Sequence, residues 1–285
     1  MPPAQSPVPT LVPGPIPDTV LRDVYTSDQD MYPVSLPYSR LRAWVDACQD
    51  LSVCFHFDQG DNSLASSAAA GYADCGPGSG SGGRLAVEHG RDGAGSAAGG
   101  IVAGVVIALP LRRPFWEDLI RGRVKEWEIE PGNMFAFPSQ DSDRHGRNGR
   151  NEGEEVGLHV YHIERFGTWS RVQRNKRFSE LALEEVITRV QARREWKIVG
   201  MSALTATPAG KMAFESLGFS TTGYKELFVA DSQRHDETTD KGPLEIVCVY
   251  PGDSMEPDRV ADRGVIISVS EMTAKFLTTP EIDGV

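Results

Sequence analysis

The sequence predicts a mixed α/β domain in which helices flank a central mixed sheet. Short apolar segments rich in β-branched residues recur between residues 51 and 250, and such segments are typical of strands. Segments with apolar residues at helical spacing lie between several of them. The Pro-rich start and the Gly-, Ala- and Ser-rich stretch 59–98 contain too few apolar residues to join a core.

The first half of the chain is expected to supply two helices and three strands. Residues 40–50 place Leu41, Trp44 and Val45 on one helical face, and the alternation in 51–58 predicts a strand. Three further elements are expected after the Gly-rich stretch: a strand over 100–111 that is buried on both faces and ends at Pro110, a helix over 113–127, and a short strand over 133–137.

The second half alternates strands and helices more regularly. A helix over 178–194 carries apolar residues at i, i+3, i+4 and i+8. Thr207 followed by Pro208 marks the start of a short helix that ends at Gly218. Four strands are expected around these two helices, over 156–163, 196–204, 219–230 and 244–250.

These elements define the expected domain organisation. One ordered domain spans 19–251 and is preceded by a disordered N-terminus over 1–18. It contains the low-complexity insertion 59–98 and a polar loop over 138–153. Residues 252–285 are expected to form a C-terminal tail, in which one apolar run, 265–269, has no assigned place.

The composition excludes several classes of protein. The formal net charge of −11 disfavours nucleic-acid binding, although the basic stretch 171–177 keeps that alternative open. The four cysteines show no metal-ligand spacing, so no metal site is expected. The apolar run 101–111 is too short to span a bilayer, and no secretory pattern opens the sequence. We therefore expect an intracellular protein, cytoplasmic or nuclear, without membrane contact.

The segment 154–251 contains the most specific pattern. Its order is strand, basic loop, helix, strand, a short helix ending in Leu217, Gly218 and Phe219, and two further strands, which resembles the second half of the GNAT superfamily of N-acetyltransferases. The sequence AGKMAFESLGF at 209–219 carries the resemblance most closely. The long insertion is similar to those in GNAT-like proteins of filamentous fungi. The resemblance implies an acyl-CoA N-acyltransferase fold, acetyl-CoA as co-substrate, and an amine-bearing acceptor, either a small molecule or a protein lysine.

A site for the coenzyme A phosphates is expected at the start of the helix 178–194. Backbone N–H groups at a helix start bind anions, and several cations precede this helix in the stretch 171–177. The resemblance implies that the pantetheine arm pairs with the strand that ends at Ile163. The expected cofactor-binding residues are Ile163, Gln173, Arg174, Asn175, Lys176, Arg177, Phe178 and Ser179.

Amide formation requires a base that takes a proton from the amine and an acid that protonates the thiolate. The resemblance places the thioester near the ends of the central strands, where four side chains are candidates for these roles: His162, Glu164, Tyr224 and Glu226. A chain of water molecules is the alternative to a side-chain base. The leading hypothesis is acetyl transfer by direct attack of the amine within a ternary complex.

Four positions depart from the family's pattern. Lys176 and Phe178 stand where it has small residues, Thr207 where asparagine often opens the helix, and Phe214 where tyrosine often supplies the acid. These departures support a second hypothesis, a GNAT-like binding or scaffold protein that has lost catalysis. The sequence specifies neither the acceptor nor the oligomeric state.

Overall fold

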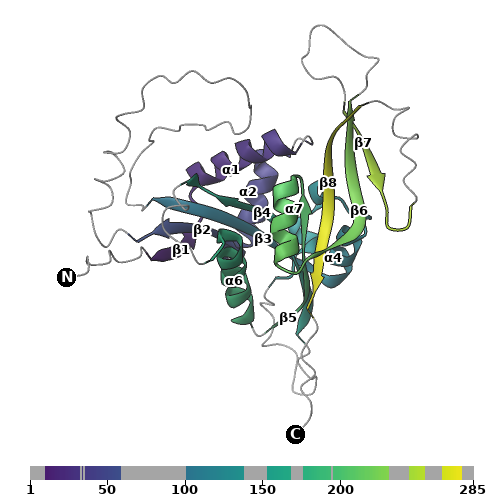
Figure 1. Ribbon diagram of the computed structural model, residues 1–285. Helices are drawn as coiled ribbons and strands as arrows, with labels where there is room; N and C mark the ends of the chain where they lie inside the picture. The colour runs from purple at the N-terminus through teal and green to yellow at the C-terminus, as the bar shows by residue number, and fades with distance from the viewer. Residues whose placement is uncertain are drawn as a thin grey trace, which may run out of the picture.

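The structure, a computed structural model, describes residues 10–32, 34, 36–58, 101–137, 153–167, 176–193, 195–230, 244–253 and 265–277. Their strands form one mixed sheet with the order β1-β2-β3-β4-β5-β8-β6-β7 (Figure 1). The strands are β1 (Leu11–Pro15), β2 (Ser52–Phe57), β3 (Val102–Arg112), β4 (Glu154–Arg165), β5 (Trp196–Thr205), β6 (Ser220–Ala230), β7 (Leu244–Val249) and β8 (Val265–Phe276). β4 and β5 pair in parallel, and the other neighbouring strands pair antiparallel.

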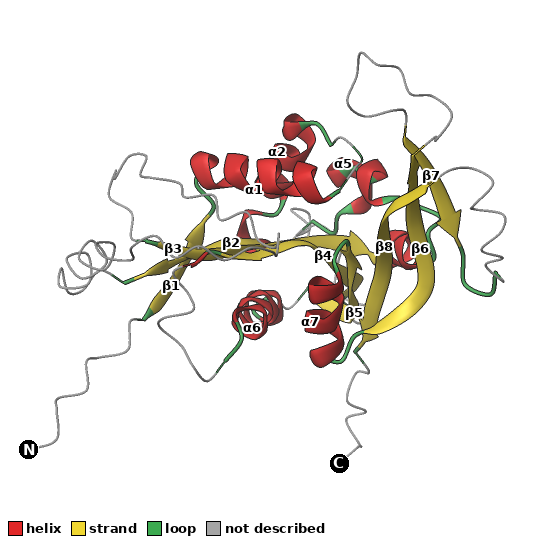
Figure 2. Ribbon diagram, turned by 45° about the horizontal axis from the view of Figure 1, so that its top comes forward, coloured by secondary structure: helices red, strands yellow, loops and turns green. Residues whose placement is uncertain are grey.

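Helices cover both faces of the sheet, which confirms the predicted α/β class. Figure 2 shows α1 and α2 on one face and α6 and α7 on the other. The helices are α1 (Asp18–Met31), α2 (Tyr38–Ala47), η1 (Gln49–Leu51), α4 (Arg113–Ile120), η2 (Glu126–Glu128), α5 (Pro131–Met134), α6 (Phe178–Gln191) and α7 (Pro208–Ser216). Phe178, Ala182 and Val186 of the predicted apolar stripe of α6 are buried, and Leu181 is half-buried. Trp44 of α2 is also buried, and its Nε1 donates to Ile129 O at 2.9 Å. None of the described helices is long and apolar enough to cross a membrane.

Pro110 does not end β3, contrary to the sequence prediction. The strand continues to Arg112 and pairs with β4 as far as Val156. The carbonyl oxygen of Pro110 accepts a hydrogen bond from the Ala136 N–H at 2.8 Å, so the polar backbone groups of this residue point away from β4. Its ring nitrogen therefore faces a side where no ladder donor is needed, and the proline is tolerated.

Residues 113–137 also differ from the prediction. α4 ends at Ile120, because Gly122 turns the chain with a φ of +73°, a conformation that glycine adopts readily. The 3-10 helix η2 and the short helix α5 then replace the expected continuation and the expected strand over 133–137. An isolated bridge between Leu111 and Phe135 takes the place of the strand expected over 133–137.

The expected disordered N-terminus, residues 1–18, contains an edge strand. β1 pairs with β2 from Leu11↔Phe57 to Pro15↔Val53. Its two prolines suit an edge, because one side of an edge strand donates to no ladder. The insertion 59–98 lies outside the described residues, as does 138–152 of the predicted polar loop.

The expected tail 252–285 supplies a strand within the sheet. β8 lies between β5 and β6 and pairs antiparallel with both, so the strand over 244–249 is not the last one, and the domain extends beyond residue 251. The predicted succession from β4 through α6, β5, α7 and β6 to β7 is confirmed. This succession and the mixed sheet agree with the acyl-CoA N-acyltransferase fold that the resemblance implied.

Candidate active site

β4 and β5 separate part of the way along the sheet. Their parallel ladder runs from Glu154↔Trp196 to His159↔Ser202 and stops there. β4 then continues to Arg165 alongside β3, and β5 continues to Thr205 alongside β8. We call the unpaired stretches 160–165 of β4 and 203–205 of β5 the fork. Backbone groups on the inner sides of the fork do not pair with each other.

A β-bulge lies at the start of the fork. Ile107 pairs with His162 and Ala108 with Val160, which leaves Tyr161 as the extra residue of β4. The bulge turns both Tyr161 and His162 towards α1: the Tyr161 hydroxyl donates to Asp28 at 2.6 Å, and His162 Nδ1 lies 4.0 Å from the same carboxylate.

The backbone of Ile163 faces the inside of the fork. The N–H of Phe166 donates to Ala103 O in β3. Because backbone groups alternate in direction along a strand, Glu164 also faces β3 and Ile163 faces the opposite side, towards β5. The structure therefore turns the backbone of Ile163 towards the unpaired inner side of the fork.

A series of buried side chains is hydrogen-bonded through His159 and Ser202, the last pair of the β4–β5 ladder. Trp116 Nε1 donates to Ser202 Oγ at 2.9 Å, Ser202 Oγ lies 3.0 Å from His159 Nδ1, and His159 Nε2 lies 2.6 Å from Glu126 Oε1. Burial lowers the pKa of His159 to about 3. Burial, followed by the nearby carboxylates of Asp28 and Glu226, raises the pKa of Glu126. His159 and Glu126 therefore favour their uncharged forms and hydrogen-bond to each other.

A second polar group lies on β6 around Glu226. The Tyr224 hydroxyl donates to Glu226 Oε1 at 2.6 Å, and Tyr32, at the end of α1, donates to Oε2. Lys125 Nζ donates to the Tyr224 hydroxyl at 2.7 Å, and the Cys248 thiol lies 3.6 Å from that hydroxyl. Burial raises the pKa of Glu226, and burial together with the Glu226 charge raises the pKa of Tyr224.

The end of α1 joins the groups on β4 and β6 into one cluster. Asp28 contacts the bulge, and Tyr32, one helical turn later, contacts Glu226. Burial also raises the pKa of Asp28. The cluster thus combines two buried carboxyl groups, Glu126 and Glu226, and the half-buried carboxyl of Asp28 with phenols at the fork, an environment suited to a cationic ligand or to a proton that moves between ligand and protein.

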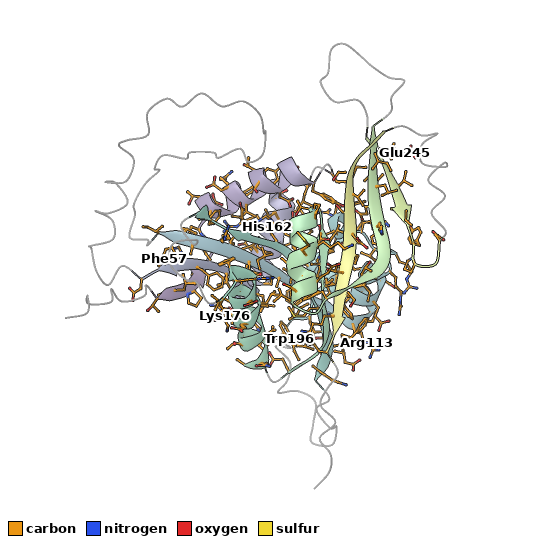
Figure 3. The ribbon with its side chains drawn as sticks, in the orientation of Figure 1. Phe57, Arg113, His162, Lys176, Trp196 and Glu245 are labelled. Atoms are coloured by element: carbon orange, nitrogen blue, oxygen red, sulfur yellow. The ribbon has the colours of Figure 1, made fainter. Side chains whose placement is uncertain are left out.

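The four candidate catalytic residues fall into two pairs in this cluster. His162 Nε2 lies 3.2 Å from Glu164 Oε2, and Tyr224 lies 2.6 Å from Glu226. His162 is labelled on β4 in Figure 3. α1 links the two pairs, because Asp28 lies beside His162 and Tyr32 bonds Glu226.

Several members of the cluster were missed by sequence reasoning: Asp28, Tyr32, Lys125, Glu126, His159, Tyr161 and Ser202. The alternation of polar and apolar residues in 156–163 could have identified His159 and Tyr161, because both lie on the strand that was predicted. No local pattern identifies Glu126, since its burial follows from the turn at Gly122 and the short helices after it.

Fewer of the expected cofactor-binding residues can be placed. Gln173, Arg174 and Asn175 lie outside the described residues. Before α6, Lys176 Nζ pairs with Glu184 at 2.6 Å, and Arg177 Nη1 donates to Ser216 Oγ of α7 at 2.5 Å. Both side chains are exposed, and Figure 3 labels Lys176 at this position. Ser179 is half-buried in the first turn of α6.

Phe178 does not fill the fork. Its ring packs edge-on against Phe55, with centroids 5.4 Å apart, and occupies the space beside Gly104, where a Cβ would lie 2.4 Å from the ring. The ring thus anchors the start of α6 to β2 and β3. Phe214 is likewise buried, against Phe219 at 4.9 Å, and Thr207 caps α7 by accepting from the Gly210 N–H at 3.0 Å.

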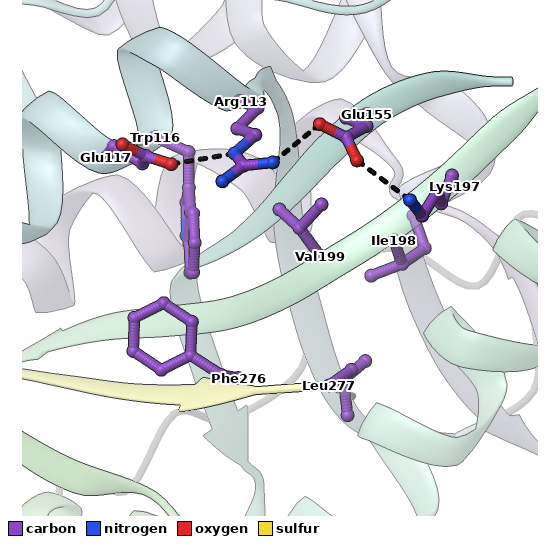
Figure 4. Close-up of a pocket in the computed structure, with 9 residues that line it drawn as sticks. All are labelled: Arg113, Trp116, Glu117, Glu155, Lys197, Ile198, Val199, Phe276 and Leu277. Atoms are coloured by element: carbon purple, nitrogen blue, oxygen red, sulfur yellow. Dashed lines mark hydrogen bonds and ion pairs between the residues drawn. The ribbon is translucent and has the colours of Figure 1, made fainter. Parts of the chain in front are cut away.

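A hollow of about 240 Å³ lies away from the fork, near the start of the β4–β5 ladder (Figure 4). The rings of Trp116 and Phe276 meet edge-on there at 5.4 Å. The charges at its rim pair with one another: Arg113 lies 2.7 Å from both Glu117 and Glu155, and Lys197 lies 2.9 Å from Glu155. Because these charges are matched, the hollow offers little to an anionic cofactor. Within the described ranges, no group of three or more His, Cys, Asp or Glu could hold a metal ion.

No protein-family model and no curated protein matches the sequence. Among solved structures, Arabidopsis thaliana NAA60 in complex with acetyl-CoA is similar with a TM-score of 0.42 and 10% identity, over 94% of this chain and 99% of that chain. Arylalkylamine N-acetyltransferase 2 from Aedes aegypti is similar with a TM-score of 0.39 and 11% identity, over 94% of this chain and 99% of that chain.

Proposed function

We propose that this protein is an acyl-CoA-dependent N-acyltransferase that transfers an acetyl group from acetyl-CoA to an amine by direct attack in a ternary complex. The observation that carries the proposal is the fork between β4 and β5, which opens beside a buried cluster of carboxyl groups and phenols. The fork offers strand backbone to an acyl carrier, and the cluster offers proton acceptors to an amine.

The coenzyme would lie with its amide-containing arm against Ile163, whose backbone faces the inside of the fork. Its phosphates would meet the N–H groups at the start of α6, with Lys176 and Arg177 beside them. The same proposal includes Gln173, Arg174, Asn175, Phe178 and Ser179, which the sequence places around that turn. Glu180 accepts from the Arg177 N–H at 3.3 Å, so it occupies one of the donors at this helix start.

The chain's own residues supply the proton chemistry. A carboxylate at Glu226 can remove a proton from an ammonium group, and its raised pKa brings it closer to the value that such a transfer requires. Tyr224, bonded to Glu226 and to Lys125, keeps its proton in the free protein because its pKa is raised. Its donation to a leaving thiolate therefore requires that Glu226, once protonated, returns a proton to the phenol oxygen. His162 and Glu164 form the alternative pair on β4.

A binding protein without catalysis is the second candidate. It is favoured by Phe178 and Phe214, aromatic side chains buried at positions where the resemblance leads one to expect a small residue and a tyrosine. This candidate predicts that the fork binds a ligand but that no acyl group is transferred.

A thermal-shift titration with acetyl-CoA tests the proposal. Binding at a concentration 100 times Kd stabilises the native state by about 2.7 kcal/mol, which appears as a clear rise in Tm. Arg177→Glu should reduce that rise, because it reverses a charge at the proposed phosphate site. Arg22→Glu, an exposed arginine on α1, is the matched control and should leave the rise unchanged.

Release of the free thiol with a panel of amines then separates the two candidates. Transferase activity requires an amine-dependent rate, whereas a binding protein shows the shift in Tm without any release. If millimolar acetyl-CoA produces no shift in the wild-type protein, the transferase proposal is wrong.

A further inference from the structure

Ser270 of β8 is a fully buried hydroxyl without a partner. Its side chain is 0% exposed, and its Oγ has no hydrogen-bond partner within the described part of the chain. Buried polar groups are nearly always hydrogen-bonded, because an unmade bond costs stability. An unpartnered hydroxyl in the interior therefore calls for an explanation, and a ligand that supplies the missing hydrogen bond is one such explanation.

Ser270 lies directly opposite Glu226. The two residues are Cα partners in the antiparallel β6–β8 ladder, within a stretch of regular register from Lys225↔Glu271 to Phe228↔Ser268. Opposite residues in such a ladder present their side chains to the same face. The Ser270 hydroxyl and the Glu226 carboxylate therefore share one buried site on the α1 side of the sheet.

This shared site borders the fork. The last pair of the β5–β8 ladder is Thr205↔Glu271, so β5 has ended at the level of Ser270. The end of α1 lies over the same place, because Tyr32 donates to Glu226. The Tyr32 ring packs edge-on against Phe228 with centroids 5.1 Å apart. The site is thus lined by a carboxylate, a hydroxyl and aromatic rings.

The chemistry of the lining fits an ammonium group. Glu226 is held by two phenols, and Lys125 donates to Gly122 O and the Tyr224 hydroxyl. A primary ammonium brings three N–H donors and a positive charge. A carboxylate and a hydroxyl both accept such donors, and aromatic faces attract the charge.

We propose that Glu226 and Ser270 bind the ammonium group of the acceptor, and that this acceptor is a primary alkylamine. The chemical steps after binding rest on the proposed transferase function. One N–H bond of the ammonium breaks as an O–H bond forms on Glu226. The nitrogen keeps the electron pair and forms a C–N bond to the acyl carbon as the C–S bond breaks, and the sulfur leaves with its electron pair as a thiolate. Tyr224 gives its proton to that thiolate and regains one from Glu226, which then accepts the remaining surplus proton of the acylated nitrogen. Ser270 touches the acceptor and sets specificity, because its oxygen accepts from a second N–H.

The experiment compares Ser270→Ala with the wild-type protein in the absence of acetyl-CoA. Binding of n-butylamine is measured by thermal shift, with 1-butanol as the uncharged probe of the same shape. Nα-acetyl-lysine methylamide, as a third probe, distinguishes a lysine side chain from a free amine. The wild-type protein should bind the amine and not the alcohol, and Ser270→Ala should weaken amine binding about tenfold.

The same variant should not destabilise the free protein. Removing an unpartnered buried hydroxyl leaves no bond broken, so the Tm of free Ser270→Ala should equal or exceed that of the wild type. Ser268→Ala, two residues earlier on the same strand, is the control and should leave amine binding unchanged. Equal binding of butanol and butylamine, unchanged amine affinity in Ser270→Ala, or a fall in its Tm of several degrees would each overturn the inference.

The outcome separates this inference from the proposed function. If acetyl-CoA binds and is consumed with amines while Ser270→Ala has no effect, the ammonium site is wrong and the transferase stands. If butylamine binds through Ser270 but acetyl-CoA neither binds nor reacts, the ammonium site stands and the transferase is wrong.

Discussion

Burial shifts the pKa values of individual residues near the fork. The clearest case is the pair of Glu126 and His159, both buried and 2.6 Å apart. Their pKa values move in opposite directions, upwards for Glu126 and down to about 3 for His159. Each shift favours the uncharged form, since the interior solvates charge poorly. A buried neutral pair of this kind can pass a proton without carrying net charge into the core.

The raised pKa of Glu126 predicts how stability depends on pH. A carboxyl with a folded-state pKa above its unfolded value contributes stability that is complete below about pH 4.5. That contribution is lost as the pH rises towards the folded-state pKa. Glu126→Gln cannot ionise and loses nothing over the same range. The difference in unfolding free energy between Glu126→Gln and wild type should therefore grow with pH, by up to about 1.4 kcal/mol per unit.

Denaturant unfolding of both proteins between pH 5 and pH 8 measures this difference. His159 has the opposite sign, because a lowered pKa gives stability that is lost as the pH falls below about 6.5. His159 is present in both proteins, so its contribution to the free energy of unfolding largely cancels in the difference between them. A constant or shrinking difference for Glu126→Gln would show that the pKa of Glu126 is not raised.

At the scale of elements, the turn after α4 positions the polar cluster. Gly122 adopts φ +73°, and the ring of Tyr224 packs directly against it, so that an added Cβ would lie 2.2 Å from the ring. The carbonyl oxygen of Gly122 also accepts from Lys125, which in turn bonds Tyr224. The turn thus fixes Lys125 and Tyr224 at the same time.

Gly122→Ala should therefore destabilise the protein. The left-handed backbone costs roughly 1–2 kcal/mol for a residue with a Cβ, and the clash with Tyr224 adds about 1–3 kcal/mol. Thermal unfolding should show a fall in Tm of several degrees. Gly132→Ala is the control, since a Cβ there meets nothing within 4 Å, and its Tm should stay near the wild-type value. Equal melting of the two variants would contradict the packing of Tyr224 on the turn.

The elements predicted from sequence are those whose signal is local. β2, β4, β5, β6 and β7 each carry their pattern within a few residues, as does the cap that Thr207 gives to α7. β1 was missed because its prolines argue against a strand unless its edge position is known. For the polar cluster, the sequence could place Tyr224 and Glu226 on their strand, whereas the burial of Glu126 depends on tertiary folding.

At the scale of the whole molecule, a strand from late in the chain completes the interior of the sheet. The apolar run 265–269 had no assigned place, because nothing near it in the sequence shows that it enters the sheet. In the structure β8 fills the position between β5 and β6 and contributes Met272 and Ala274 to the core. It also brings Ser270 to Glu226. β8 pairs with β5, which borders the fork, and with β6, which carries Glu226, so it joins the two parts of the candidate site.

A chain that ends at Asp253 should accordingly fail to fold. Without β8, β5 and β6 each lose the strand that they pair with, so both become exposed sheet edges. The expected result is loss of the cooperative thermal transition, together with aggregation, measured by circular dichroism and size-exclusion chromatography. A chain that ends at Leu277 keeps every strand of the described sheet and should melt like the full chain. A cooperative, native-like transition in the shorter chain would mean that β5 and β6 do not need β8, and the link between Ser270 and the fork would be lost with it.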